Sequence, residues 1–520
     1  TEPERGVITD VAPRTELEVR VCGVFADVVG VDGVGPEDDF FLLGGHSLAA
    51  MRVVARLGGA GVGLRLRDVF EAPTARALAG RLEALEAAAF DDAGGGEPIG
   101  GGVVSRVRPE WLPASLAQRR LWTVACVEGA SAAYNIPLVS RLRGPLDVVA
   151  LQEALRDVVE RQEVLRTVVT SVDGEPFQQL LGVPEISDLC AVVDVSGLGE
   201  RERLEVVRQC SARPFDLERD LPVRMWILEE GADSHVLVLV MHHIASDGMS
   251  MSPLLGDLRW AYCARVLGVS PSWDPLEVTY ADYTLWQHEQ VDQGVLAVEV
   301  DWWRARLAGV PEETRLPGVL PAVGSGGRPA GVVGVVVPAE VLARLQRLAS
   351  GCGASVFMVC QAAVAVLLNR LGAGDDVVLG AVTAGRDDPG LEPLVGFFVN
   401  TVAIRHDLAG NPTVTTVVER ARDAILGALD HSRVPFDMVV GAVAPARVPG
   451  RHPLFQVMVT HVSETGEGSA GIGLPGLEVE DLHPGSLGAK FDLSFKINEV
   501  PGPDGAELVV HLEHATDRFD

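Results

Sequence analysis

The chain has 520 residues, enough for three or four domain-sized units, and is 47% hydrophobic and 22% charged, as globular proteins are. Its net charge of -29 argues against binding to nucleic acid or to an anionic membrane, because phosphate contacts need clustered basic residues. No signal-type segment or uninterrupted transmembrane run is present, so no membrane association is expected.

The basic and sulfur-containing residues carry further information. Lysine occurs only at Lys490 and Lys496, which we interpret as a bias of genome composition. The seven cysteines are scattered without a C-x-x-C pair, which disfavours a zinc site and fits a reduced, cytoplasmic chain. The chain starts with TEPERG instead of methionine, so we expect it to be part of a longer protein.

Residues 12–88 have the hydrophobic spacing of helices. Leu17, Val21, Phe25 and Val28 lie on one face of a first helix. Further helices are predicted to begin at Ser47 and just after Pro73, where proline is favoured in a first turn. We predict a small four-helix bundle. The glycine-rich stretch 58–63 lacks the preceding strand and the spacing of a nucleotide-binding loop, and we interpret it as a connection between helices.

A glycine-rich segment, residues 89–107, follows as a flexible linker. Beyond it the chain alternates strands and helices, which predicts an α/β fold of two lobes, residues 108–275 and 276–520. In the first lobe we expect a helix over 148–162, a buried strand over 235–243 and a helix opened by Ser252 and Pro253. In the second we expect helices over 339–350 and 355–372 and strands over 376–382 and 394–405.

The buried strand ends in a histidine pair, His242 and His243, and Asp247 and Gly248 follow it. If the strand continues through His243, the two imidazoles point to opposite faces and cannot share a metal ion, and no third ligand is evident. A serine-hydrolase triad would need a nucleophile. Two interpretations remain open from these residues: one catalytic imidazole held by its neighbours, or a pair of buried core histidines.

Ser47 lies in the stretch GGHSLA, which also has several interpretations. It nearly matches the G-x-S-x-G nucleophile elbow, but the last glycine is missing and too little chain precedes it for the large sheet that the elbow needs. It could equally be an ordinary N-cap. The third possibility is a serine that carries a phosphate-linked group at a helix N-terminus, where free amides and the helix dipole favour negative charge.

Eight motifs in a fixed order resemble those of nonribosomal peptide synthetase condensation domains, which share the chloramphenicol acetyltransferase-like fold. The resemblance covers residues 108–520. The motifs are SLAQRRLW from Ser115, YNIP from Tyr134, RQEVLRT from Arg161, MHHIASDGMS from Met241, YADYTLWQ from Tyr280, VGFFVNT from Val395, HSRVPFDMVV from His431 and RHPLFQVM from Arg451. The resemblance implies two lobes arranged as a pseudo-dimer.

The same resemblance implies roles for five residues. His243 is the expected catalytic imidazole and His242 is structural. Asp247 is expected to brace the site through an ion pair with Arg386 of the other lobe, and the backbone N–H of Gly248 is expected to face the thioester oxygen. No metal site is expected.

The chain departs from the family pattern at two positions. Gln162 stands where the family usually has histidine, and Met249 stands where tryptophan is common. Neither is the expected catalytic residue, but both leave the shape of the pocket open.

The stretch DDFFLLGGHSL resembles peptidyl carrier proteins, which implies 4'-phosphopantetheine attached to Ser47 by a phosphopantetheinyl transferase. A carrier upstream of a condensation domain implies a donor aminoacyl or peptidyl thioester that an acceptor aminoacyl-thioester amine attacks. The implied partners are an upstream adenylation domain and downstream adenylation and carrier domains. GGHSL instead of GGDSI favours an L-configured or achiral donor residue.

Several rival functions share parts of this motif set. An epimerisation domain shares the histidine pair but differs in its later motifs, and a heterocyclisation domain would replace the pair by aspartates. A degenerate module that recruits a partner to the carrier tends to lose the second histidine, which is present here. Acyl transfer to a free small molecule is the last rival. We expect a monomer.

Overall fold

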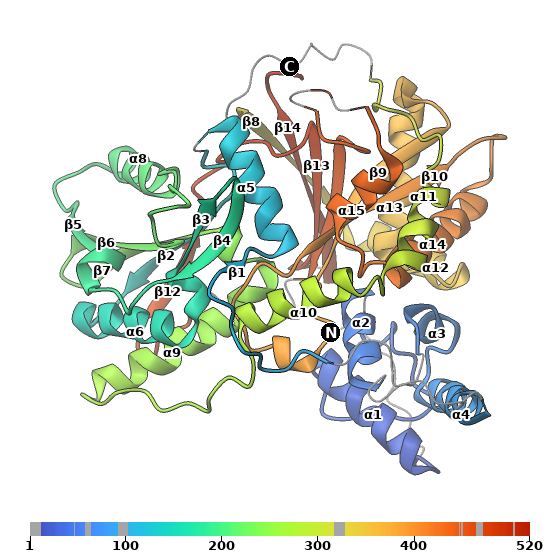
Figure 1. Cartoon of the computed structure of the whole chain (residues 1–520), viewed down its shortest axis with the longest axis horizontal. Coiled ribbons are helices and arrows are strands. Elements are labelled where there is room, and N and C mark those ends of the chain that lie inside the picture. Colours follow the sequence, from blue (N-terminus) through green and yellow to red (C-terminus); the bar gives the residue numbers. More distant parts are fainter. Residues whose placement is uncertain are drawn as a thin grey trace.

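The computed structural model describes residues 12–45, 47–57, 64–91, 102–129, 131–316, 328–446, 448, 451–463, 472–502 and 505–519. The glycine-rich stretch 58–63 and linker residues 92–101 lie outside the described part. Figure 1 shows three bodies: two α/β lobes side by side and a small helical unit beneath the second lobe.

The N-terminal unit consists of helices α1 (Glu16–Val29), α2 (Ser47–Leu57), α3 (Leu66–Glu71) and α4 (Ala75–Asp91). Thr15 caps α1 by accepting a hydrogen bond from the backbone N–H of Glu18 at 3.0 Å. Gly30 ends the helix in the left-handed conformation, φ 76°. Phe25 and Phe40 pack in the core with ring centroids 4.8 Å apart. The predicted four-helix bundle is confirmed.

The first lobe is built on a five-stranded sheet of order β12-β2-β7-β6-β5. Its strands are β2 (Asn135–Arg143), β5 (Cys190–Asp194), β6 (Val223–Gly231), β7 (Ser234–His242) and β12 (Glu478–Leu482). A smaller sheet contains β1 (Leu112–Pro113), β3 (Thr167–Val172) and β4 (Glu175–Leu180). The helices are α5 (Leu116–Glu128), α6 (Val148–Arg161), α7 (Ile186–Leu189), α8 (Glu200–Ser211), α9 (Met251–Val266) and α10 (Tyr280–Asp292).

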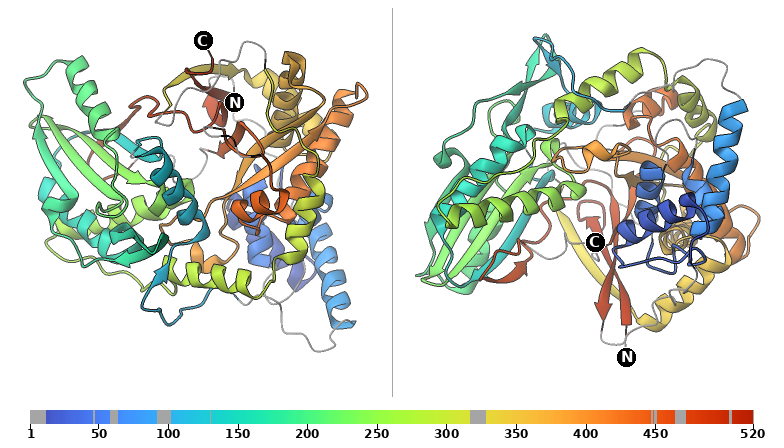
Figure 2. Two further views of the ribbon diagram at one scale, coloured as in Figure 1. Left: turned by 45° about the horizontal axis from the view of Figure 1, so that its top comes forward. Right: turned by 90° about the horizontal axis from the view of Figure 1, so that it is seen from below.

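The second lobe is built on a six-stranded sheet of order β10-β9-β11-β13-β14-β8. Its strands are β8 (Ala330–Val337), β9 (Asp376–Thr383), β10 (Asn400–Asp407), β11 (Val457–Ser463), β13 (Leu493–Gly502) and β14 (Gly505–Ala515). The helices are α11 (Ala297–Arg306), α12 (Ala339–Gly351), α13 (Val356–Leu368), α14 (Val414–Asp430) and α15 (Phe436–Val443). In the left view of Figure 2, the two lobes meet along one side and diverge toward the other.

The lobes are linked by one strand that crosses from the second lobe into the first-lobe sheet, which the sequence did not predict. Strand β12 lies late in the chain but pairs antiparallel with β2 of the first lobe, with Leu482 opposite Val139. Ser140 of β2 also donates a hydrogen bond to Asp481 at 2.9 Å. A single boundary near residue 275 therefore does not separate the two lobes in space.

Three predicted element bounds were wrong. Strand β7 ends at His242, and His243 begins a short 3-10 turn, so the strand does not continue through both histidines. Helix α9 begins at Met251, because a 3-10 turn capped by Asp247 precedes it. The strand expected over 394–405 begins only at Asn400, since the preceding residues form a loop between the lobes.

Helix α13 begins the segment Val356–Ala373, which is long and apolar enough to span a membrane by length and composition alone. The fold accounts for this apolarity, because α13 is packed between α12, α14 and strand β9. Met358, Ala365 and Leu368 are each at most 1% exposed. The segment is thus explained as a core helix.

The N-terminal unit packs against the second lobe through α2 and α3. Helix α3 contacts α14, and Arg56 of α2 forms an ion pair with Glu392 at 3.3 Å. Both side chains are about one-third exposed, so the pair contributes only about 0.2–1 kcal/mol. This ion pair therefore adds little to the free energy of docking, and apolar residues of the two bodies also pack in one hydrophobic cluster.

We expect the charge reversal Arg56→Glu to lower the docked fraction of the N-terminal unit, because two carboxylates would then face each other. The double variant Arg56→Glu/Glu392→Arg should restore it. Energy transfer between dyes placed on α4 and α12 measures the docked fraction. Asp27→Asn is the matched control, since Asp27 lies 3.8 Å from Arg56 within the N-terminal unit. Equal transfer in all four proteins would show that this pair does not orient the unit.

Candidate functional site

A cavity of about 1490 Å³ lies where the three bodies meet. Residues from each body line it: Met51 and Val54 of α2, His243 and Gly248 of the first lobe, and side chains of the second-lobe sheet. Those sheet residues are Met458, Thr460, Ser494, Lys496, Asn498, His511 and Glu513. The cavity therefore connects the N-terminal unit with His243 and has a polar wall on the second lobe.

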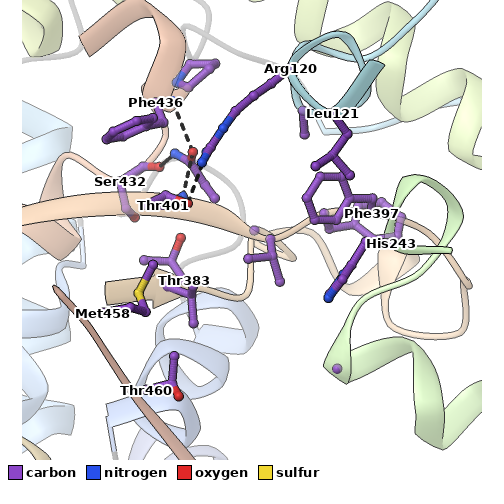
Figure 3. Close-up of a pocket in the computed structure, with 18 of the residues that line it drawn as sticks. Arg120, Leu121, His243, Thr383, Phe397, Thr401, Ser432, Phe436, Met458 and Thr460 are labelled. Atoms are coloured by element: carbon purple, nitrogen blue, oxygen red, sulfur yellow. Dashed lines mark hydrogen bonds between the residues drawn. The ribbon is translucent and has the colours of Figure 1, made fainter. Parts of the chain in front are cut away.

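His243 points from the first lobe into this cavity, as Figure 3 shows. Its backbone N–H donates to the carbonyl oxygen of Tyr134 at 2.9 Å, and its ring lies 5.8 Å from that of Phe397. The Nδ1 atom is 3.1 Å from the carbonyl oxygen of Ser246. A carbonyl oxygen only accepts, so Nδ1 carries the proton and Nε2 has the free lone pair.

The surroundings of His243 favour its neutral form. Burial lowers the pKa of His243 well below its ordinary value, and the charge of Lys490 acts in the same direction. The hydrogen bond to Ser246 opposes this shift without reversing it. The imidazole is therefore neutral at physiological pH and can accept a proton at Nε2.

His242 is buried and has a structural environment. Its Nδ1 accepts a hydrogen bond from the backbone N–H of Ile244 at 3.1 Å, and its ring packs 5.8 Å from Phe215. Burial lowers its pKa to about 3. His242 does not line the cavity in the described part of the chain. The end of β7 thus separates the two rings: one enters the core and the other enters the cavity.

Asp247 is fully buried and holds the two lobes together. Its Oδ1 is 3.3 Å from Nη2 of Arg386, and its Oδ2 accepts from the backbone N–H of Phe398 at 2.9 Å. Ser250 donates to Oδ1 through its N–H and its hydroxyl, at 2.9 and 2.8 Å. Arg386 also donates to the carbonyl oxygen of Leu394 at 2.8 Å. The pair implied by the resemblance is present, and it acts through the backbone around His243.

Gly248 follows directly and is exposed to the cavity. It begins a 3-10 turn, and in the described part of the chain no acceptor takes its N–H. A Cβ built at this position would meet open space, so a side chain here would enter the cavity without disturbing the fold. The position thus offers a free backbone donor beside His243.

The two departures from the family pattern lie away from the imidazole. Gln162 is buried, accepts from the N–H of Val395 at 3.0 Å and donates to the carbonyl oxygen of Pro393 at 3.0 Å. It therefore fixes the same inter-lobe loop that Asp247 holds. Met249 is not among the cavity residues in the described part of the structure.

Ser47 is the first residue of α2, and its side chain lies outside the described part. The helical repeat places it one turn before Met51, on the face that borders the cavity. The turn before it requires glycine: the N–H of Gly45 donates to the carbonyl oxygen of Phe40 at 2.9 Å, and a Cβ at Gly45 would overlap the Phe40 ring. A phosphate-linked group on Ser47 would thus stand at a helix N-terminus bordering the cavity.

Sequence reasoning missed the cavity wall of the second lobe. Loop residue Phe397 and strand residues such as Lys496 and Glu513 approach His243 only through the inter-lobe packing. The alternation of residues along β13 could have predicted this wall, because polar side chains stand at every second position: Ser494, Lys496 and Asn498. Among the described residues, no three histidine, cysteine, aspartate or glutamate side chains are grouped as metal ligands would be.

Comparison with known proteins identifies the family. Residues 110–520 match the condensation domain model, and residues 19–82 match the phosphopantetheine attachment site model. The chain belongs to the condensation domain family. The dimodular nonribosomal peptide synthase of Bacillus subtilis is 37% identical over 521 residues, and the isonitrile lipopeptide synthase of Mycobacterium tuberculosis is 36% identical over 495 residues. These alignments cover 98% and 94% of the chain but only 21% and 19% of the relatives.

Solved structures support the same fold. The X-domain from teicoplanin biosynthesis superimposes with a TM-score of 0.75 and 33% identity, covering 81% of this chain and 93% of that one. The two-lobed chloramphenicol acetyltransferase-like fold is confirmed. The condensation domain is an acyltransferase that forms amide bonds on carrier-bound substrates, and the attachment site implies covalent 4'-phosphopantetheine.

We expect Asp247→Asn to lower the free energy of unfolding by about 3–5 kcal/mol, because it leaves the guanidinium of Arg386 buried without its counter-charge. Urea denaturation followed by tryptophan fluorescence measures the change. The matched control is Glu205→Gln, which breaks a solvent-exposed pair with Arg208 and should cost less than about 1 kcal/mol. Equal losses in both variants would contradict a bracing role for Asp247.

Proposed function

We propose that the chain forms a peptide bond between a donor acyl group held on Ser47 and the amine of an acceptor aminoacyl thioester. The single observation that supports this most strongly is the continuous cavity between α2 and His243. The group on Ser47, when bound, supplies an acyl thioester, an activated donor that requires no enzyme nucleophile. Catalysis then depends on alignment, proton transfer and stabilisation of the carbonyl oxygen.

His243 is the proposed catalytic imidazole. Its Nε2 lone pair faces the cavity, because Nδ1 is engaged by Ser246. As the C–N bond forms and the C–S bond of the donor thioester breaks, the attacking nitrogen would lose a proton to Nε2, and the imidazolium could return that proton to the departing thiolate. The α-amino group has an ordinary pKa near 8, so its neutral form is accessible and a strong base is not needed. His243 therefore orients the amine and takes up its proton.

Gly248 is the proposed oxyanion donor. Its N–H has no acceptor in the described part of the chain, and the residue lines the cavity at the start of the turn that Asp247 caps. Backbone donors fixed in this way stabilise the charge that develops on a carbonyl oxygen. Asp247 and Arg386 contribute by holding this turn, since among the described residues neither carboxylate oxygen of Asp247 forms a hydrogen bond with the His243 ring.

A rival function is recruitment of a protein partner to the carrier. One structural relative, with 32% identity and a TM-score of 0.74, is an X-domain in complex with OxyB from teicoplanin biosynthesis. The neutral imidazole of His243 and its open access to the cavity favour catalysis in this chain. An epimerisation or small-molecule acyltransferase activity has no comparable support.

The remaining assignments follow from this function. The proposed partners are a phosphopantetheinyl transferase, an upstream adenylation domain, and downstream adenylation and carrier domains of one assembly line. The donor residue is proposed to be L-configured or achiral. The seven cysteines are all free in the structure, which supports a reducing, cytoplasmic location, and the chain is proposed to act as a monomer.

Ser47→Ala should abolish loading of the carrier, because the hydroxyl that would form the phosphodiester is removed. Intact-protein mass spectrometry after incubation with coenzyme A and a phosphopantetheinyl transferase measures loading. Wild type should gain one phosphopantetheine and the variant none. Ser131→Ala is the control and should load fully. Loading of the Ser47→Ala variant would place the attachment at another residue.

His243→Ala should reduce peptide formation by about 10²–10⁴-fold, the usual contribution of one general acid–base group. The assay uses a donor loaded on Ser47, a separate loaded acceptor carrier and single-turnover detection of the product by mass spectrometry. His511→Ala is the matched control, because His511 lines the same cavity from β14. Wild-type protein that forms no product, or a His243→Ala variant as fast as wild type, would refute the proposed function.

A further inference from the structure

The two lysines of the chain both line the cavity that contains His243. Every other basic residue is arginine, so the composition bias inferred from the sequence does not explain where the two exceptions lie. Lysine differs from arginine because it is a compact ammonium that responds to burial. Both ammonium groups of the chain thus belong to one cavity wall.

Lys490 occupies a particular position in the cavity. It precedes β13 in the second lobe and extends to the first lobe, where its Nζ lies 5.3 Å from the ring centroid of Tyr134. The carbonyl oxygen of Tyr134 in turn accepts the backbone N–H of His243 at 2.9 Å. Lys490 is thus a cation across the cleft from the segment that holds the imidazole.

The charge of Lys490 is not neutralised by a close carboxylate. Within the described ranges, no aspartate or glutamate forms an ion pair with it. Glu513 of β14 is instead engaged by Lys496 at 3.5 Å and by the hydroxyl of Ser486 at 3.1 Å. An unpaired ammonium facing a partly enclosed cavity acts on other charges there more strongly than a solvated surface charge.

We propose that Lys490 is an electrostatic positioning residue that keeps the resting imidazole of His243 neutral and disfavours entry of the protonated acceptor amine into the cavity. This inference rests on the proposed function, because it concerns the amine that attacks the donor. A positive charge disfavours a second positive charge nearby, so a neutral amine enters more easily than an ammonium. The nucleophile is then ready to react when it reaches Nε2 of His243.

The charged groups around Lys490 give the sign of the effect. Burial lowers the pKa of Lys490 to about 8, Lys496 acts in the same direction and Glu513 opposes them. The ammonium is therefore mostly charged at pH 7. On His243, burial, Lys490, His242 and Lys496 all disfavour protonation, and only the hydrogen bond to Ser246 favours it. His452, His461, His483 and His511 also line the cavity, and they are the other imidazoles that the pH series must take into account.

The test is the pH dependence of kcat at saturating acceptor carrier, because kcat reports groups in the bound complex. In Lys490→Met the acidic limb should move to higher pH by on the order of one unit, the effect of one charge several ångström away. Lys490→Arg keeps the charge and should restore the wild-type limb. Lys496→Met is the matched control, and its shift should be smaller because Glu513 offsets that charge.

A second measurement does not depend on turnover. With only two lysines, protein labelled with ¹³C-lysine gives two side-chain signals, which the Lys496→Met variant assigns. The Lys490 signal should show an ammonium at pH 7 that titrates near pH 8. A neutral Lys490 at pH 7, or an acidic limb in Lys490→Met that coincides with that of wild type, overturns the proposal. Wild-type protein that forms no peptide would instead refute the proposed function.

Discussion

The buried ion pair between Asp247 and Arg386 is the interaction on which the site depends. It joins the turn after β7 in the first lobe to the chain after β9 in the second. Such a pair is a poor source of net stability, because both charges lose their hydration. Its value here is geometric. The carboxylate also caps the Gly248 turn and accepts from Phe398, so the backbone donor and the inter-lobe loop are fixed by the same two oxygens.

The cavity chemistry follows from this fixed junction. His243 lies directly after the end of β7, where the chain turns, and its imidazole points into the cavity. Because its Nδ1 is held by a carbonyl oxygen, the nitrogen that is left free is defined by the backbone and not by a second side chain. A neutral imidazole is suited to orienting an amine and accepting one proton. Such an imidazole is not suited to removing protons repeatedly from a carbon atom, which requires a stronger base.

The sequence predicted the fold class, the carrier bundle and the histidine pair because each has a local signal. Helical spacing in the N-terminal unit and the apolar run before His242 are properties of short segments. The crossing of β12 into the first-lobe sheet and the wall formed by β11, β13 and β14 depend on contacts between residues far apart in the chain, and no local period reports them. The loop before Asn400 was misassigned as strand for the same reason: its apolar side chains pack between lobes instead of within a sheet.

The carrier contact and the lobe contact are built from different polar interactions. The lobes share buried charges, a paired strand and the Gln162 hydrogen bonds, so their relation is stable. The carrier is held beside them by the one-third exposed pair of Arg56 and Glu392 and by packing of α3 on α14. Buried apolar residues of the carrier and of the second lobe also belong to one hydrophobic cluster. The exposed pair can orient the carrier at little energetic gain, whereas the buried charges fix the geometry of the cavity that contains His243.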